Sequence, residues 1–226
     1  MSKLTRIAYK AGPVPLKAIH RVGGEPIGIS KATWPLFHGK PMVHVLTLGA
    51  EAIVVPLPPH VAAVAVFVGS LTENEAFTPD TQESKVVFLS AQDVARGTTS
   101  AMDVLGAPMP GEVPPEGTLV MAASTYDFAS VREPGGQAEA DMDEEEISGA
   151  ITEFMGAQCD EPIDGCPVYA LSAPHVAWLQ GAEAPDGHSV LFWFDEQLVP
   201  GLNCGTGYMY VCSNDDATDG RAWWQC

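Results

Sequence analysis

Apolar residues gather in short runs separated by proline- and glycine-rich stretches, and this pattern predicts a protein of many short strands. Valine, leucine and aromatic residues, which suit a pleated surface, fill the runs. Seven runs are predicted strands: 42–48, 61–68, 85–90, 118–123, 191–194, 208–212 and 222–225. The stretches between most of them are too short for regular crossover helices, so the sheet is expected to be largely antiparallel. The fold class is therefore α+β with few helices.

One segment, residues 141–155, has helical periodicity. An apolar stripe recurs at the spacing of one helix face, through Ile147, Ile151, Phe154 and Met155. Acidic residues stand at its front, where they suit the positive end of a helix dipole: Asp141, Asp143, Glu144, Glu145 and Glu146. Gly156 is a suitable end for the helix.

The chain also repeats part of itself. Trp34, Pro41 and His44 are followed by the apolar run 45–48, and Trp178, Pro185 and His188, at the same spacing, are followed by the apolar run 190–194. Two copies of one supersecondary unit indicate an architectural role for these residues. We therefore expect a single domain, residues 1–226, made of two related halves, approximately 20–105 and 165–226. An acidic helical connector near 139–156 would lie between the halves.

Charge restricts the partners. Twenty-nine acidic against eleven basic residues give a formal net charge of −18. Such a chain repels nucleic acid and anionic lipid and attracts basic proteins. Acidity can also serve solubility alone. The first residues show no export signal, and the longest apolar run, 61–68, is too short to span a bilayer, so a cytoplasmic location is expected.

Candidate chemistry is sparse. The five cysteines form no C-x-x-C pair, although Cys159 and Cys166 flank a loop and could approach each other. The six histidines show no metal-ligand spacing, and no nucleophile elbow or dinucleotide-binding loop is present. We therefore expect no catalytic set, no metal and no cofactor. His44 and His188 are interpreted as structural, although a cleft lined by Trp34, His44, Trp178 and His188 remains an alternative.

Two surfaces are candidates for binding a partner. The first is the acidic cluster from Asp141 to Glu146, which could mimic phosphate toward a basic protein or simply be a solvated helix start. The second is the pair Trp223 and Trp224. Neighbours on a strand face opposite sides, so we expect one of the two to be exposed, as an interface anchor.

Several segments taken in order resemble the YwqG-like family of bacterial proteins. They are Arg21-Val-Gly-Gly-Glu-Pro, Trp34-Pro-Leu-Phe-His-Gly-Lys-Pro-Met42, Pro174-His-Val-Ala-Trp178-Leu-Gln180, Gly205-Thr-Gly-Tyr-Met-Tyr-Val and Trp224-Gln-Cys226. The resemblance covers roughly 20–70 and 170–226. It departs after the first strand, where Thr47-Leu-Gly-Ala-Glu51 stands in place of the family's Ala-Gln and acidic residue. The resemblance implies an α+β fold of two related halves and a link to bacterial toxin–immunity loci, but no catalytic residues.

These observations lead to three hypotheses. The first is a non-enzymatic immunity-type protein that blocks a cognate toxin, a basic one such as a nuclease. The second is a small-molecule-binding domain or enzyme with a cleft between the two halves. The third is a scaffold that forms homodimers through a strand edge or the tryptophan pair.

Overall fold

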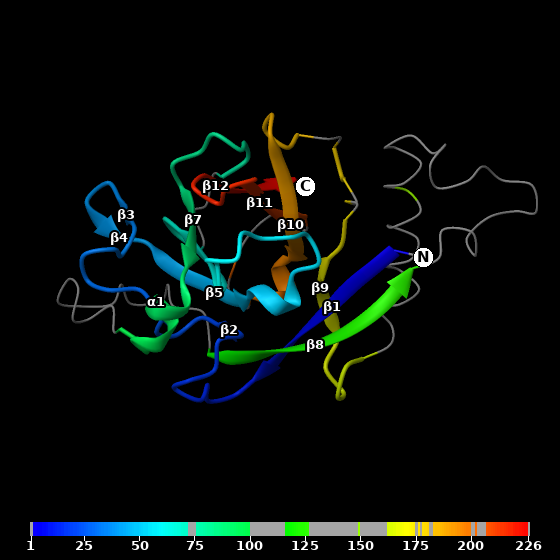
Figure 1. Cartoon of the computed structure of the whole chain (residues 1–226), viewed down its shortest axis with the longest axis horizontal. Helices are drawn as coiled ribbons and strands as arrows, with labels where there is room; N and C mark the ends of the chain where they lie inside the picture. The colour runs from blue at the N-terminus through cyan, green and yellow to red at the C-terminus, as the bar shows by residue number, and fades with distance from the viewer. Residues whose placement is uncertain are drawn as a thin grey trace, which may run out of the picture.

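The fold is a single ten-stranded sheet that curls until its two edges meet (Figure 1). The computed structural model describes residues 2–71, 76–99, 116–126, 149, 162–174, 176, 178–180, 183–199, 202 and 207–225. Every strand pair in the sheet is antiparallel, so the predicted fold class is confirmed in its coarse form.

The strands follow the order β12-β11-β10-β9-β1-β8-β2-β5-β6-β7. Their bounds are β1 Ser2–Ala11, β2 Arg21–Val22, β5 Val43–Gly49, β6 Ala63–Val68, β7 Ser84–Leu89, β8 Gly117–Tyr126, β9 Val168–Ser172, β10 His188–Asp195, β11 Tyr208–Asn214 and β12 Gly220–Gln225. A separate small hairpin is formed by β3 Leu36–Phe37 and β4 Lys40–Pro41. The helical elements are α1 Ala91–Ala95 and the 3₁₀ turns η1 Ala50–Ala52 and η4 Glu196–Leu198.

The middle of the sheet is the long antiparallel pair β1 and β8. Their register runs without interruption from Ser2 opposite Tyr126 to Ala11 opposite Gly117. β1 continues the sheet through β9, and β8 continues it through β2. Because the N-terminal strand occupies the centre, strands from both ends of the sequence belong to one continuous ladder.

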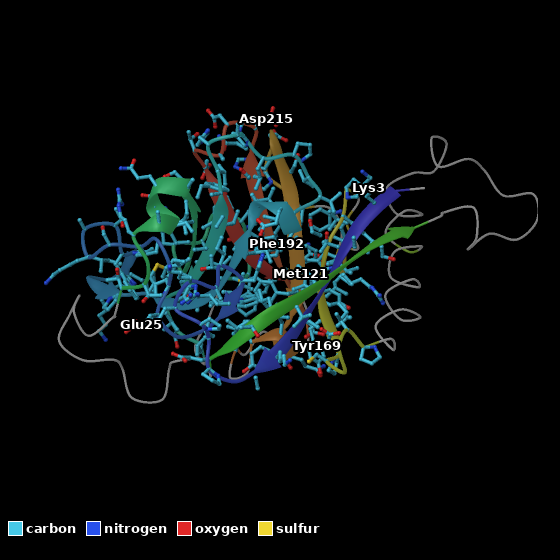
Figure 2. The ribbon with its side chains drawn as sticks, turned by 60° about the horizontal axis from the view of Figure 1, so that its bottom comes forward. Lys3, Glu25, Met121, Tyr169, Phe192 and Asp215 are labelled. Carbon is cyan, nitrogen blue, oxygen red and sulfur yellow. The ribbon has the colours of Figure 1, made fainter. Side chains whose placement is uncertain are left out.

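The concave side of the sheet encloses the main core. Strand residues from most of the sheet meet there, and Figure 2 shows Met121 and Phe192 toward the middle of the molecule, with Lys3 and Asp215 at its periphery. The connections that contain η1 and η4 also enter this core, with Ala52 and Leu198 buried. A barrel of this size is therefore filled by side chains and by two of its own connections.

Two further apolar clusters cover the outer face. One lies mainly on β6 and includes Trp34 and Phe67. The other lies on β9 to β12 and includes Trp193, Tyr210 and Trp223. Both sides of these strands are thus buried, which explains why they appear in the sequence as continuous apolar runs rather than alternating ones.

The edges β7 and β12 meet through side chains. The hydroxyl of Ser84 donates to the carbonyl of Ala222, and the backbone N–H of Trp224 donates to Ala76 O at 2.8 Å. The guanidinium of Arg221 pairs with Asp219 at 2.8 Å and also with Asp80, in the connection before β7. Ionic and hydroxyl contacts therefore close the curled sheet at this junction.

The junction also needs a residue without a side chain. A Cβ at Gly220 would lie 2.8 Å from the Phe88 ring and from the Val86 Cβ. We expect Gly220→Ala to lower the free energy of unfolding by about 1–3 kcal/mol through overpacking. The measurement is urea unfolding, with Gly149→Ala as control because nothing lies within 4 Å of a Cβ there. A Gly220→Ala protein as stable as wild type would show that the edges are not closely packed.

All seven predicted strands are confirmed, with small shifts at their ends. The sequence analysis did not identify β1, β9 or α1, and the predicted helix 141–155 lies outside the described residues except for Gly149. Cys166 is a free thiol, whereas Cys159 lies outside the described residues. The described part of the chain has no helix with the length and apolar character needed to cross a membrane.

Candidate functional site

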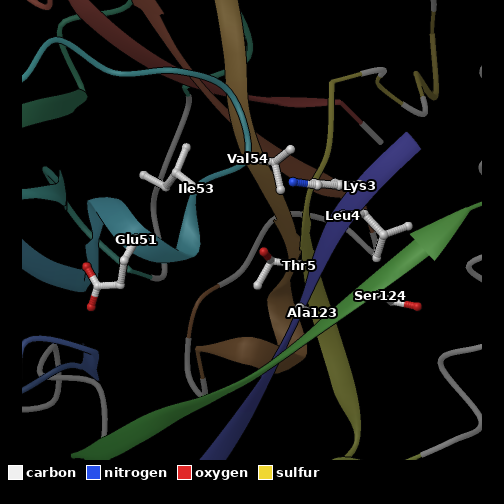
Figure 3. A pocket seen from close by; sticks show the side chains of 8 residues that line it. All are labelled: Lys3, Leu4, Thr5, Glu51, Ile53, Val54, Ala123 and Ser124. Carbon is white, nitrogen blue, oxygen red and sulfur yellow. The ribbon is translucent and has the colours of Figure 1, made fainter. Parts of the chain in front are cut away.

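A cavity of about 680 Å³ opens at one end of the barrel, between the η1 connection and the paired strands β1 and β8 (Figure 3). It is lined by Lys3, Leu4, Thr5, Glu51, Ile53, Val54, Ala123 and Ser124. Its volume falls within the range of ordinary small-ligand sites, about 300–1,000 Å³. The lining comes from three segments that are distant in sequence, so only the folded chain forms it.

Glu51 carries the negative charge of the cavity, and its position is fixed by neighbours. Its Oε1 lies 2.8 Å from His20 Nε2, and the Nδ1 of the same ring accepts the backbone N–H of Gly49 at 3.2 Å. Because Nδ1 accepts a hydrogen bond, the proton of the neutral imidazole is on Nε2 and is donated to Glu51. The carboxylate is therefore oriented by a neutral ring and keeps its own charge.

Lys3 and Thr5 supply the opposite wall. They alternate along β1 and so share one face of it, and Figure 3 shows the ammonium of Lys3 and the hydroxyl of Thr5 directed toward the space beside Val54. Among the described residues, Lys3 makes no ion pair. Its charge is available to a ligand.

The apolar wall is held to the barrel by a relay of hydrogen bonds. The backbone N–H of Val54 donates to Ser172 Oγ at 2.9 Å, and that hydroxyl donates to Leu191 O at 2.6 Å. Ser172 is fully buried, so the relay joins the η1 connection to β9 and β10. The cavity wall is therefore preformed.

The predicted residues Trp34 and His44 lie on the outer face near Phe67. Trp34 Nε1 donates to Met42 O at 3.0 Å, and its ring meets Phe67 edge-on at 5.9 Å. The two ring nitrogens of His44 lie 2.9 Å from Gly23 O and 2.8 Å from Thr47 Oγ1. Both side chains are buried with their polar atoms bonded.

Trp178 and His188 belong to the β10–β12 side. Trp178 stacks on Tyr210 at 4.9 Å between ring centroids, and β12 anchors its segment because Gln225 Oε1 accepts the N–H of Leu179 at 3.1 Å. His188 begins β10, with Nε2 3.4 Å from Asp219 Oδ2. In the described part of the chain, nothing joins these two residues to Trp34 and His44. The alternative of one cleft lined by all four has no contact to support it.

Trp223 and Trp224 face opposite sides of β12, as expected for neighbours on a strand. Trp223 belongs to the outer cluster and Trp224 to the interior core, and their exposed fractions are 0% and 1%. The prediction that one of them is exposed is therefore wrong. The outer face of β12 is covered by Trp178 and its neighbours, which a sequence pattern for a single strand does not reveal.

The acidic cluster Asp141, Asp143, Glu144, Glu145 and Glu146 lies outside the described residues. Within the described residues, no group of three or more His, Cys, Asp or Glu side chains has a metal-binding arrangement. Burial raises the pKa of the Cys212 thiol to about 12, which disfavours its thiolate. The cavity beside η1 is the arrangement with ligand-binding chemistry that the geometry supports best.

The sequence was compared with models of known protein families and with curated proteins, and neither comparison finds a match.

Proposed function

We propose that this chain is a non-enzymatic, immunity-type protein that binds and blocks a basic cognate toxin through its acidic connection between β8 and β9. The observation that carries this proposal is the distribution of charge. Of the 29 acidic residues, eleven lie between positions 127 and 161, together with one of the eleven basic residues. A charge excess of this size attracts a basic partner over a long range and speeds its encounter.

The sheet holds both ends of this acidic connection next to the same strand. It leaves β8 at Tyr126, which is opposite Ser2 of β1, and the chain returns in β9, where Val168 is opposite Ala8 of β1. The connection is thus attached at two points to a closed barrel. This attachment supports a role in presenting negative charge to a partner protein such as a nuclease, whose active surface is basic because it binds phosphate.

The proposal includes a fold of two related halves and a distant relationship to the YwqG-like family. The two related halves are supported by a bulge in each of β5 and β10, between His44 and Leu46 and between Val190 and Phe192. Each strand is followed directly by a 3₁₀ turn, η1 or η4. In the structure, these features align His44 with Val190. The sequence repeat aligns His44 with His188, so the two alignments differ by two residues.

The test begins with capture of the partner on the immobilised chain, its identification and its purification. Association with the purified partner is then followed in 50 mM and 300 mM NaCl. We expect salt to slow association of wild type strongly. Replacing Asp143, Glu144 and Glu145 by lysine is expected to slow association at low salt about ten-fold or more.

A matched control separates local from overall charge. Glu183, Asp186 and Asp215 are exposed residues of the described barrel, and replacing these three by lysine changes the net charge by the same amount. We expect this control to slow association much less. If the acidic-connection variant associates at the wild-type rate in 50 mM NaCl, the proposed surface is wrong.

Small-ligand binding is the second candidate function, and one observation favours it. The cavity of about 680 Å³ beside η1 has preformed walls and charged groups of both signs. It lies at a different place from the cleft that the sequence suggested.

A further inference from the structure

The cavity beside η1 has a negative group that is fixed in position. His20 donates one hydrogen bond to Glu51 Oε1, and the second carboxylate oxygen is available, since the side chain of Glu51 is 65% exposed. The ring that orients the carboxylate is neutral, because its Nδ1 accepts the Gly49 N–H. A cationic ligand group therefore meets an uncompensated carboxylate. A charge-assisted hydrogen bond of this kind is stronger than a neutral one.

The wall formed by β1 has the complementary chemistry. The Lys3 ammonium and the Thr5 hydroxyl are directed into the cavity, and both can donate to a ligand carboxylate (Figure 3). In Figure 3, Ile53 and Val54 lie between Glu51 and Lys3, and Ala123 lines the cavity beside Thr5. The cavity thus has a donor wall, an apolar middle and an acceptor wall.

A strand end also borders the cavity. β1 pairs with β9 only from Thr5 onward, so within the described residues the backbone of Lys3 and Leu4 is paired on the β8 side alone. An extended peptide can add to such an edge through main-chain hydrogen bonds. The volume of about 680 Å³ is larger than a single amino acid requires.

We propose that this cavity binds a short peptide with free ends, with the ligand carboxylate at Lys3 and Thr5 and the ligand ammonium at Glu51. This inference rests on the second candidate function, small-ligand binding, and adds the chemical class of the ligand. A simple anion would leave the Glu51 carboxylate with only its hydrogen bond from His20, and a simple cation would leave the Lys3 ammonium without an anionic partner. A zwitterion pairs both.

The test uses trialanine and its blocked forms as probes in isothermal titration calorimetry with the full chain. We expect trialanine to bind, and N-acetylation or C-amidation to weaken binding about ten-fold each. In Glu51→Gln the effect of N-acetylation should disappear while the effect of C-amidation remains. In Lys3→Gln the reverse is expected. Lys10→Gln and Glu116→Gln, exposed charges at the other end of the β1–β8 pair, are the controls and should bind as wild type does.

A positioning variant moves the carboxylate without removing its charge. Gly49 has φ −68°, so alanine is allowed there, but its Cβ would lie 2.7 Å from Glu51 Oε1. We expect Gly49→Ala to displace the flexible carboxylate and to lose discrimination against N-acetylated peptide, as Glu51→Gln does. Thermal melting should show an intact fold. An unchanged preference for the free amino end in this variant would count against the assigned contact.

Two results overturn the inference. One is the absence of trialanine binding at 10 mM, and the other is equal affinity for free and doubly blocked trialanine. Ala123→Trp fills the cavity. This variant distinguishes failure of the peptide assignment from failure of small-ligand binding, the second candidate function. If a compound of different chemistry binds wild type but not Ala123→Trp, small-ligand binding stands and the peptide assignment is wrong.

Discussion

Arg21→Ala is expected to lower the free energy of unfolding by about 1.5–3 kcal/mol, the range for hydrogen bonds with a charged donor. Arg21 is 3% exposed, and its guanidinium donates to the carbonyls of four residues in the connections around β2. These carbonyls belong to Pro15, Leu16, Ala18 and Glu25, at distances of 2.5–3.2 Å.

The physical reason lies in the chain on both sides of β2. Residues 12–20 and 23–35 form no strand of the main sheet, so their carbonyls depend on partners outside a ladder. Burial lowers the pKa of Arg21, an effect opposed by the charges of Glu116 and Glu25.

Urea unfolding at pH 7.5 measures this effect. Lys17→Ala is the matched control, because Lys17 is an exposed cation in the same connection and should change stability by less than about 0.5 kcal/mol. Arg21→Lys keeps the charge but not the planar fork of donors, so we expect it to restore only a small part of the loss. An Arg21→Ala protein within 1 kcal/mol of wild type would show that other donors replace the guanidinium.

The sequence predicted the strands that are buried on both faces, because an apolar run is a local signal. β6, with all of its residues buried, is the clearest case. β1 was not predicted, because its exposed residues Lys3 and Lys10 give it the mixed composition of a surface segment. Its central place in the sheet depends on pairing with β8, more than 100 residues away in the sequence, and no local pattern carries that information.

The candidate site was missed for a related reason. The repeated tryptophans and histidines are conspicuous in the sequence, yet none of them lines the cavity. Glu51 and Lys3 are ordinary charged residues in the sequence. They line one cavity only because the fold places η1 against β1. The one local signal was Glu51 itself, an acidic residue directly after a buried strand, beside a glycine that leaves room for its carboxylate.

Asp195→Asn is expected to make the protein lose stability in acid, because it removes the titration of Asp195, which opposes the effect of His44 on stability. Burial lowers the pKa of His44 from 6.5 to about 4, and the charge of Arg21 acts in the same direction. Burial raises the pKa of Asp195 from 3.8 to about 6, with the Gln197 and Leu198 backbone opposing. The two shifts have opposite effects on stability as pH falls.

The sign follows from proton uptake in each state. Between pH 6.5 and 4 the unfolded chain protonates His44 but the folded chain does not, so this residue's contribution is complete above pH 6.5 and is lost toward pH 4. Between pH 6 and 3.8 the folded chain protonates Asp195 but the unfolded chain does not, so acid stabilises the fold through this group. From pH 7.5 to 4.5 each effect amounts to about 2–3 kcal/mol, and the sum is small.

Urea unfolding of wild type, Asp195→Asn and His44→Gln across this pH range tests the opposition. Asparagine can still accept the Gln197 N–H that Asp195 accepts at 2.7 Å, so the turn η4 keeps its cap. Relative to wild type, Asp195→Asn should gain stability at pH 7.5 and lose that gain by pH 4.5. His44→Gln should be less stable at pH 7.5 and recover toward wild type at pH 4.5. Parallel pH profiles for the three proteins would mean that neither group titrates as its burial requires.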